Sequence, residues 1–341
     1  MRPSSAIASQ PVVGNLNYRF RSLVFDSMTA QVDASVLGRH VGVWLLAGYI
    51  ALYTTMLLAM RRTGNFDPTE ALLVLSILGV GFSLAAWLFT VRVSRLEYVV
   101  ANPMAELAAV AALLIPASVF ITWGLEFLHR YVPSDPEKAV MILAAKLAVF
   151  VVFPAIVMRK QFGYSLRKLA PISLRASHLL AAFGMSVLLL AFQAVLGRGL
   201  RDIAGAHLPV VALLWGVPLT FIWLILEAGA VEEFFFRVLL QTRLSGVLKS
   251  ELGAVVLMSL IFGLAHAPGI YLRTGITQEG LQNPSLLMAV GYSIVVTSVA
   301  GFFLGVLWAR TRNFAVVVIV HAAGDLLPNV LPTLHSLRLL H

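Results

Sequence analysis

The side chains with the types and spacing for chemistry are concentrated in the last third of the chain. An ionisable side chain at bilayer depth costs about 3 kcal/mol, so such residues usually mark a functional site, a pathway or a buried pair. Three carboxylates and two imidazoles in consecutive segments indicate proton-transfer chemistry inside a membrane. They form three clusters within otherwise apolar stretches: Glu232-Glu233 with Arg237, His266 four residues after Phe262, and His321 with Asp325.

The spacing of the first cluster gives its two glutamates different tasks. Residues four apart share a helix face, so Glu233 and Arg237 are expected to form an ion pair that offsets part of the cost of burying both charges. Glu232 points about 100° away and lacks that partner. A carboxylate in a water-poor pocket is a better proton acceptor near neutral pH than one in bulk water. The alternative is a cytoplasmic helix end with solvated charges.

The two histidine clusters are less specific when each is taken alone. His266 lies in a helix that Pro268 is expected to end, and a lone histidine on an apolar helix is usually a hydrogen-bonded core residue. His321 and Asp325 share a helix face, and such a pair can hold one imidazole tautomer or supply two ligands to a metal ion. The joint occurrence of all three clusters predicts that they converge on one polar pocket.

The elements that must position these residues are membrane helices. The 341-residue chain is 59% hydrophobic and 12% charged, with a mean hydropathy of +0.88, whereas ordinary globular chains carry about 25% charged residues. Apolar windows of about 20 residues predict an all-α, polytopic transmembrane bundle of about eight or nine helices. The windows lie at 41–60, 71–91, 105–125, 139–158, 179–197, 208–227, 252–268, 286–309 and 314–331.

The net charge of +9 is explained by topology rather than by nucleic-acid binding. Basic residues of membrane proteins collect in cytoplasmic loops, and a cytoplasmic N-terminus puts most of them there, including the basic loop 159–175. We therefore expect a multi-pass integral membrane protein with no nucleic-acid partner. No signal peptide is evident, because the first apolar run begins near Val41. The preceding segment 17–36 is expected to be a helix on the inner leaflet or a disordered tail.

The composition along the chain suggests three parts. These are a cytoplasmic segment 1–40, N-terminal transmembrane helices over 41–200 whose role is unassigned, and a core over 201–341 that carries the three clusters. Glu106 and Lys146 fall in neighbouring spans of the second part and are expected to pair across the bundle. Glu227 is not assigned to the site. The two glycines of Gly301-Phe-Phe-Leu-Gly305 have the spacing of a helix-packing face.

Together the three clusters resemble the motifs of a known family. Glu-Glu-x-x-x-Arg at 232–237, Phe-x-x-x-His at 262–266 and His-x-x-x-Asp at 321–325 are similar to those of the CAAX protease and bacteriocin-processing (CPBP/Abi) family. Its eukaryotic members are type II CAAX prenyl endopeptidases, which cleave prenylated proteins. The resemblance covers about 226–325. It implies an intramembrane endopeptidase that acts on a membrane-anchored or lipidated peptide or protein at the lipid bilayer.

The resemblance also implies catalytic roles. Glu232 would be the general base that activates a water, and His266 would help to hold that water. His321 and Asp325 would face the carbonyl oxygen as it becomes negative. The prenyl endopeptidases typically carry Asn at the position of Asp325. Because an aspartate donates only when protonated, Asp325 either takes that position in its protonated form or orients His321 instead.

The remaining motif residues would support the site. The resemblance makes Glu233 and Arg237 a structural pair, with Phe262 beside them. No cofactor is favoured, because the helical His-Glu-x-x-His signature of zinc proteases is absent. Zinc is the alternative, with three ligands and an open position. Those ligands would be Glu232, His266 and His321.

Two other classes of function fit the same charges. In a proton-coupled transporter they would form a relay, and inverted repeats would be expected, which the sequence does not show. In a non-catalytic membrane scaffold or immunity protein the pocket would be kept for architecture alone. The sequence leaves open the substrate, its cleavage site and whether it is prenylated.

Overall fold

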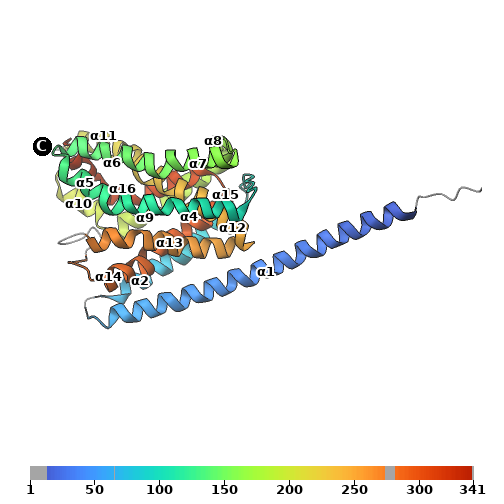
Figure 1. Cartoon of the computed structure of the whole chain (residues 1–341). Coiled ribbons are helices and arrows are strands. Elements are labelled where there is room, and N and C mark those ends of the chain that lie inside the picture. The colour runs from blue at the N-terminus through green and yellow to red at the C-terminus, as the bar shows by residue number, and fades with distance from the viewer. Residues whose placement is uncertain (1–13, 65, 273–280, 340–341) are drawn as a thin grey trace, which may run out of the picture.

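A computed structural model describes residues 14–64, 66–272 and 281–339, and this part of the chain is helical without strands (Figure 1). Nine of its helices are long and apolar enough to cross a membrane, which confirms the predicted all-α bundle. These spans are Gly38–Arg61, Pro68–Phe89, Pro103–Leu128, Asp135–Phe162, Ala176–Leu196, Val210–Leu248, Glu251–Leu272, Leu286–Thr311 and Phe314–Ser336.

Several spans combine α-helical elements with π-helical segments, which carry the labels η1 to η6. The N-terminal elements are α1 (Gly14–Arg61), α2 (Pro68–Val74), η1 (Leu75–Phe82), α3 (Ser83–Phe89), α4 (Pro103–Val119), η2 (Phe120–Gly124), α5 (Leu125–Tyr131), α6 (Asp135–Leu147), η3 (Ala148–Val152), α7 (Phe153–Phe162) and α8 (Leu166–Leu169). The C-terminal elements are α9 (Ala176–Leu196), α10 (Gly199–Gly205), α11 (Val210–Leu224), η4 (Ile225–Ala230), η5 (Glu233–Gln241), α12 (Thr242–Leu248), α13 (Glu251–Leu272), α14 (Leu286–Tyr292), η6 (Ser293–Thr297), α15 (Ser298–Thr311) and α16 (Phe314–Ser336).

The first helix begins well before the first span. Helix α1 runs without interruption over Gly14–Arg61, and its N-terminal part extends away from the bundle (Figure 1). The backbone of 17–36 is therefore helical and continuous with the first span, so the disordered tail is wrong, while a position on the inner leaflet stays a prediction. Residues 1–13 of the predicted cytoplasmic segment lie outside the described residues.

The sixth span is much longer than its apolar window. The window ends near residue 227, but helical structure continues to Leu248, and the three phenylalanines 234–236 in the extension are buried. The extension is therefore packed inside the bundle, and the alternative of a solvated helix end is wrong. Glu232 lies about 24 Å along its helix from Leu248, close to the ~22 Å between Glu251 and His266 on the next span. The two side chains consequently reach a similar depth.

Helix α13 is the central helix of the C-terminal half, in contact with α1, α12, α15 and η6. It continues through Pro268 to Leu272, the last residue described before 281, so the expectation that Pro268 ends it was wrong. A proline removes one N–H donor, and neighbouring helices compensate for that loss in membrane bundles. The glycine face predicted in α15 packs here, because a Cβ on Gly301 would lie 2.9 Å from the Phe262 ring.

The N-terminal spans pack directly on the C-terminal ones. Helix α9 lies along α16, α3 along α15, and α1 along α13. These contacts neither mark nor exclude a boundary near residue 200, so the three-part division stays a prediction.

Glu106 does not pair with Lys146, and that expectation was wrong. The Glu106 carboxylate accepts hydrogen bonds from Arg243 Nε at 3.1 Å and from the Tyr164 hydroxyl at 3.0 Å. Arg243 also donates to the Tyr98 hydroxyl at 2.9 Å. Both Glu106 and Arg243 are fully buried. This cluster ties the start of α4 to α12, because the long sixth span carries Arg243 back to the end of the bundle where α4 begins.

Candidate active site

The three charged clusters lie against one another inside the bundle. Glu232 is in the sixth span between η4 and η5, His266 is on α13, and His321 is on α16. The Glu232 Oε2 atom lies 3.8 Å from Nε2 of His266 and 3.8 Å from Nε2 of His321. These separations are too long for direct hydrogen bonds. Three side chains that are distant in sequence therefore face one point.

Close helix packing produces this convergence. The segment that contains Glu232 is flanked by π-helical turns, which are frequent at functional sites. A Cβ on Gly229 would lie 2.9 Å from the carbonyl oxygen of Val318. Because glycine has no side chain, α16 can approach this segment closely enough to bring His321 beside Glu232 and Glu233.

The convergence point opens into a cavity of about 560 Å³. Its wall includes all four residues expected to be catalytic, which are Glu232, His266, His321 and Asp325. The buried Glu232 Oε2 has no hydrogen-bond partner among the described residues. A carboxylate oxygen with free acceptor capacity thus lies at the wall of a polar cavity.

The contacts of His266 define which ring nitrogen carries its proton. Nδ1 lies 2.8 Å from the carbonyl oxygen of Phe262. A carbonyl oxygen only accepts, so Nδ1–H donates to it, and the neutral imidazole presents the lone pair of Nε2 towards Glu232.

His321 is held between carboxylates. Its Nδ1 lies 2.6 Å from Glu233 Oε1, and the same oxygen accepts a hydrogen bond from Arg237 Nη1 at 3.0 Å. On the other side of the ring, Nε2 lies 3.3 Å from Asp325 Oδ2. The Glu233–Arg237 ion pair expected from the helical spacing is present, but Glu233 also contacts the imidazole. Its part in the site is therefore larger than that of an isolated structural pair.

Phe262 packs against the polar groups of the site. Its ring centroid lies 4.8 Å from that of His266 and 6.4 Å from that of His321. The Arg237 guanidinium carbon lies 4.2 Å from the same centroid, and Nη2 donates to the carbonyl oxygen of Gly301 at 3.3 Å. The buried arginine thus combines an ion pair, a backbone hydrogen bond and a cation–π contact.

A second, more apolar cavity of about 240 Å³ adjoins the first. Its aromatic lining includes Phe120, Phe150 and Phe236. Glu232, His266 and Lys146 line both cavities. These three side chains therefore form the shared wall between a polar chamber and an apolar chamber.

Sequence reasoning missed the ion pair between Lys146 and Glu227. Lys146 is on α6 and Glu227 is in η4, and both line the larger cavity. The available signal was a single charge inside each of two apolar windows, at 139–158 and 208–227. The identity of the partners depends on how α6 packs against η4, which periodicity does not give. The N-terminal half of the chain thereby contributes a cation to the candidate site.

The positions of these side chains bear on whether the site could hold a metal ion. Zinc binds His nitrogens and carboxylate oxygens at about 2.0–2.2 Å in a tetrahedral arrangement. Within the part of the chain that the structure describes, no group of three or more His, Cys, Asp or Glu side chains is placed to hold a metal ion. The metal-free site expected from the sequence therefore stays a prediction, with Glu232, His266 and His321 as the ligands of the zinc alternative.

One family model matches the region that carries all three motifs. Residues 213–327 match the Rce1-like family, described as type II CAAX prenyl endopeptidase Rce1-like. The match spans about a third of the chain, from within α11 to α16, and confirms the resemblance read from the three clusters. No curated protein and no solved structure matches the chain.

Proposed function

We propose that this membrane protein is an intramembrane endopeptidase that hydrolyses a peptide bond of a membrane-associated protein or peptide with a water activated by Glu232. The family match of residues 213–327 supports the protease class, and the nine apolar helices support the membrane setting. The observation that carries the proposal is the position of Glu232 Oε2, 3.8 Å from Nε2 of His266 and of His321.

The first step follows from the acceptors around Glu232. Polar groups separated by more than 3.5 Å are commonly bridged by water. A water placed here donates one proton to Glu232 Oε2 and the other to the lone pair of His266 Nε2, which leaves its oxygen lone pairs directed away from both acceptors. Glu232 then removes a proton while the oxygen attacks the carbonyl carbon, as in general-base catalysis.

The second step concerns the charge that develops on the carbonyl oxygen. Each nitrogen of His321 has a carboxylate nearby, Glu233 at Nδ1 and Asp325 at Nε2, so the ring can carry a proton on both. The Nε2–H then donates to the oxyanion. Collapse of the tetrahedral intermediate breaks the C–N bond, and the proton held by Glu232 passes to the leaving amine. The products are an amine and a carboxylic acid, which keeps the second proton of the water until it ionises in solvent.

The substrate class follows from the location of the site. The four proposed catalytic residues lie among apolar helices, so the substrate is a membrane-anchored or lipidated chain that reaches them through the bilayer. We place the N-terminus in the cytoplasm because this orientation puts most basic loops on the inner side. The mechanism uses no metal ion or other cofactor.

Replacement of Glu232 by Gln tests the proposal. The variant keeps the shape of the side chain but removes the base, so cleavage of a membrane-anchored peptide library by the purified protein in vesicles should fall at least about a hundredfold. Glu70→Gln, at an exposed position in α2, is the matched control and should leave cleavage unchanged. Peptides that accumulate in cells with the Glu232→Gln variant would identify the substrate.

Three outcomes would overturn the assignment. Undiminished cleavage by folded Glu232→Gln protein would show that another group is the base. Loss of gradient-driven uptake in that variant, with no peptidase activity in the native protein, would instead identify a transporter. Full cellular function of the variant would identify a non-catalytic scaffold.

A further inference from the structure

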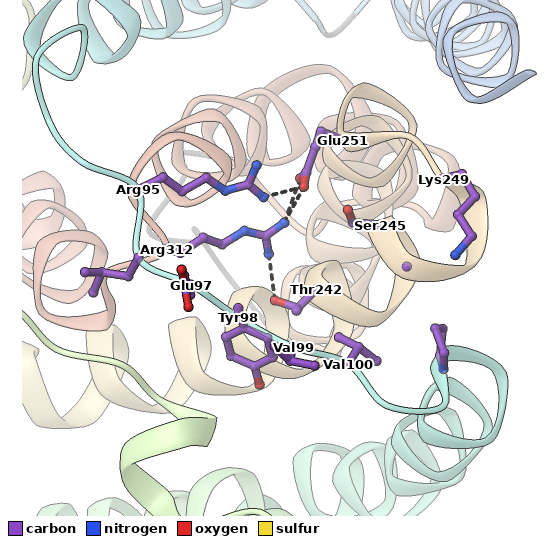
Figure 2. A pocket seen from close by; sticks show the side chains of 13 residues that line it. Arg95, Glu97, Tyr98, Val99, Val100, Thr242, Ser245, Lys249, Glu251 and Arg312 are labelled. Atoms are coloured by element: carbon purple, nitrogen blue, oxygen red, sulfur yellow. Dashed lines mark hydrogen bonds and ion pairs between the residues drawn. The ribbon is translucent and has the colours of Figure 1, made fainter. Parts of the chain in front are cut away.

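A separate polar cavity of about 550 Å³ lies at one end of the bundle (Figure 2). Its lining comes from the loop that precedes α4, from α12, and from the turns that follow α12 and α15. It shares no lining residue with either chamber beside Glu232. It is built where candidate membrane-spanning helices end, so we expect it to lie at the level of the lipid headgroups.

Basic side chains outnumber acidic ones in this cavity. Arg95, Lys249 and Arg312 line it, against Glu97 and Glu251. Both arginines use the same carboxylate: Arg312 Nη2 lies 2.7 Å from each oxygen of Glu251, and Arg95 contacts one of them. Figure 2 shows the two guanidinium groups converging on Glu251, with Lys249 on the opposite side of the cavity. One carboxylate therefore serves two cations, which leaves the cavity with an excess of donors.

Two of the basic residues have an unusual backbone conformation. Lys249 and Arg312 end α12 and α15 with φ angles of +51° and +50°. This left-handed conformation at a helix C-terminus is usually taken by glycine, because other residues are strained there. Two of the cavity's three basic residues thus occupy strained positions where a glycine would fit without strain.

The hydrogen bonds of the Arg312 side chain account for an arginine in this left-handed conformation, but no such bonds account for Lys249. Arg312 donates to the Thr242 hydroxyl at 2.9 Å and to Glu251. The Lys249 ammonium makes no hydrogen bond or ion pair with any described residue. It is a cation that lines the cavity from a strained backbone position, and its donors have no partner among the described side chains.

Arg312 also keeps an unused donor. Its side chain is 3% exposed, and its Nε has no hydrogen-bond partner among the described residues. Burial lowers the pKa of Arg312, against the opposing effect of the Glu251 carboxylate. A nearby anion would offset this unfavourable burial of charge.

We propose that this cavity binds the phosphate of an anionic membrane-lipid headgroup, with Lys249 and Arg95 as its principal ligands and Arg312 behind them. The excess of basic side chains favours an anionic ligand, and the position at the ends of the spans favours a lipid headgroup as that ligand. With a cytoplasmic N-terminus this end of the bundle faces the inner leaflet, whose anionic lipids attract basic residues.

The test measures lipid binding to the full-length protein in detergent. Native mass spectrometry with phosphatidylglycerol, phosphatidylcholine and inorganic phosphate as separate probes distinguishes a headgroup site from a free-anion site. Phosphatidylglycerol should bind more tightly than phosphatidylcholine. Lys249→Gly should weaken it about fivefold, the factor for one basic residue near an anionic membrane surface, while Lys249→Arg should retain binding.

Two features of the design keep the result interpretable. Glycine is at ease in the left-handed conformation, so Lys249→Gly removes the cation without adding backbone strain, and thermal unfolding should show an intact protein. Lys160→Gln, at an exposed basic position in α7, controls for general surface attraction and should leave binding unchanged.

Specific results would overturn the proposal. The proposal is wrong if the native protein and folded Lys249→Gly bind phosphatidylglycerol with equal affinity, or if Lys160→Gln loses as much affinity as Lys249→Gly. The basic cluster would then serve only to hold the loops together. Competition by inorganic phosphate at the concentration of the lipid would assign the cavity to a free anion instead of a headgroup.

Discussion

Glu233 Oε1 lies 2.6 Å from His321 Nδ1 and joins the first charged motif of the chain to the third. The same oxygen accepts from Arg237 at 3.0 Å, so the arginine balances the charge that holds the imidazole. A carboxylate at one ring nitrogen fixes the tautomer and the orientation of the other. In the proposed reaction, Glu233 acts through His321 and is a positioning residue.

Glu233→Gln should therefore impair the reaction without unfolding the protein. We expect kcat to fall about 10- to 100-fold, the range for partners that orient a functional histidine, while Gln still accepts from Arg237. The pH–rate profile of the purified variant should shift because the protonation of His321 changes. An unchanged rate and profile would restrict Glu233 to a structural role.

Arg237→Met should act mainly on stability. It leaves the Glu233 carboxylate buried without its cation, a change that typically costs about 3–5 kcal/mol. Adding Glu233→Gln to this variant should recover part of the loss, because the uncompensated charge is removed. Denaturant unfolding in detergent of both single variants and the double variant measures the coupling, and additive losses would contradict it.

Asp325→Asn separates the two roles open to this residue. An amide donates to an oxyanion as well as a protonated carboxyl does, so the Asn variant should retain activity if position 325 faces the carbonyl oxygen. Loss of a donor in Asp325→Ala should then lower kcat about 10²- to 10³-fold. Equal losses in both variants would show that the negative charge beside His321 is what matters.

Lys146→Met tests whether the N-terminal half contributes to the reaction. The change removes the cation from the wall shared by the two chambers and leaves Glu227 unbalanced beside the site. We expect kcat/KM to fall on the order of tenfold, and the double variant Lys146→Met, Glu227→Gln to recover part of it. Lys138→Met, at the start of α6 and also partly exposed, is the matched control. Equal activity of the native protein and these three variants would show that Lys146 has no part in the reaction.

Chelation tests the metal-free mechanism. If Glu232 activates water alone, prolonged dialysis against a chelator should leave the rate unchanged, and metal analysis of the purified protein should find far less than one zinc per chain. Stoichiometric zinc, together with loss of activity on chelation and recovery on addition of zinc, would establish a metallopeptidase. The Glu70→Gln protein, treated in parallel, controls for damage during dialysis.

The sequence was informative where structure depends on local periodicity. The nine spans follow from apolar windows, and the Glu233–Arg237 pair follows from residues four apart on one helix face. The depth of Glu232 was not predictable, because the sixth span continues past its apolar window by burying and pairing its charges. The partners of Glu106 and Lys146 were mistaken for a related reason: a window locates a charge along one helix but does not give the neighbouring helix.

The contact between Glu233 and His321 shows the same limit. Its existence depends on how closely α16 approaches the segment around Gly229, where a side chain would meet the Val318 carbonyl oxygen. A glycine at that position is visible in the sequence, but the helix that fills the space is not. The three motifs suggested a common site, and tertiary packing decides which atoms meet.

The partition formed by Glu232, His266 and Lys146 has a consequence for turnover. A polypeptide hydrolysed at this wall would leave one fragment in the polar cavity and the other among the aromatic rings of the apolar cavity. The two fragments then separate at different rates, because only one must give up apolar contacts as it departs. Release of the more hydrophobic fragment, rather than hydrolysis of the peptide bond, would then limit the rate of turnover.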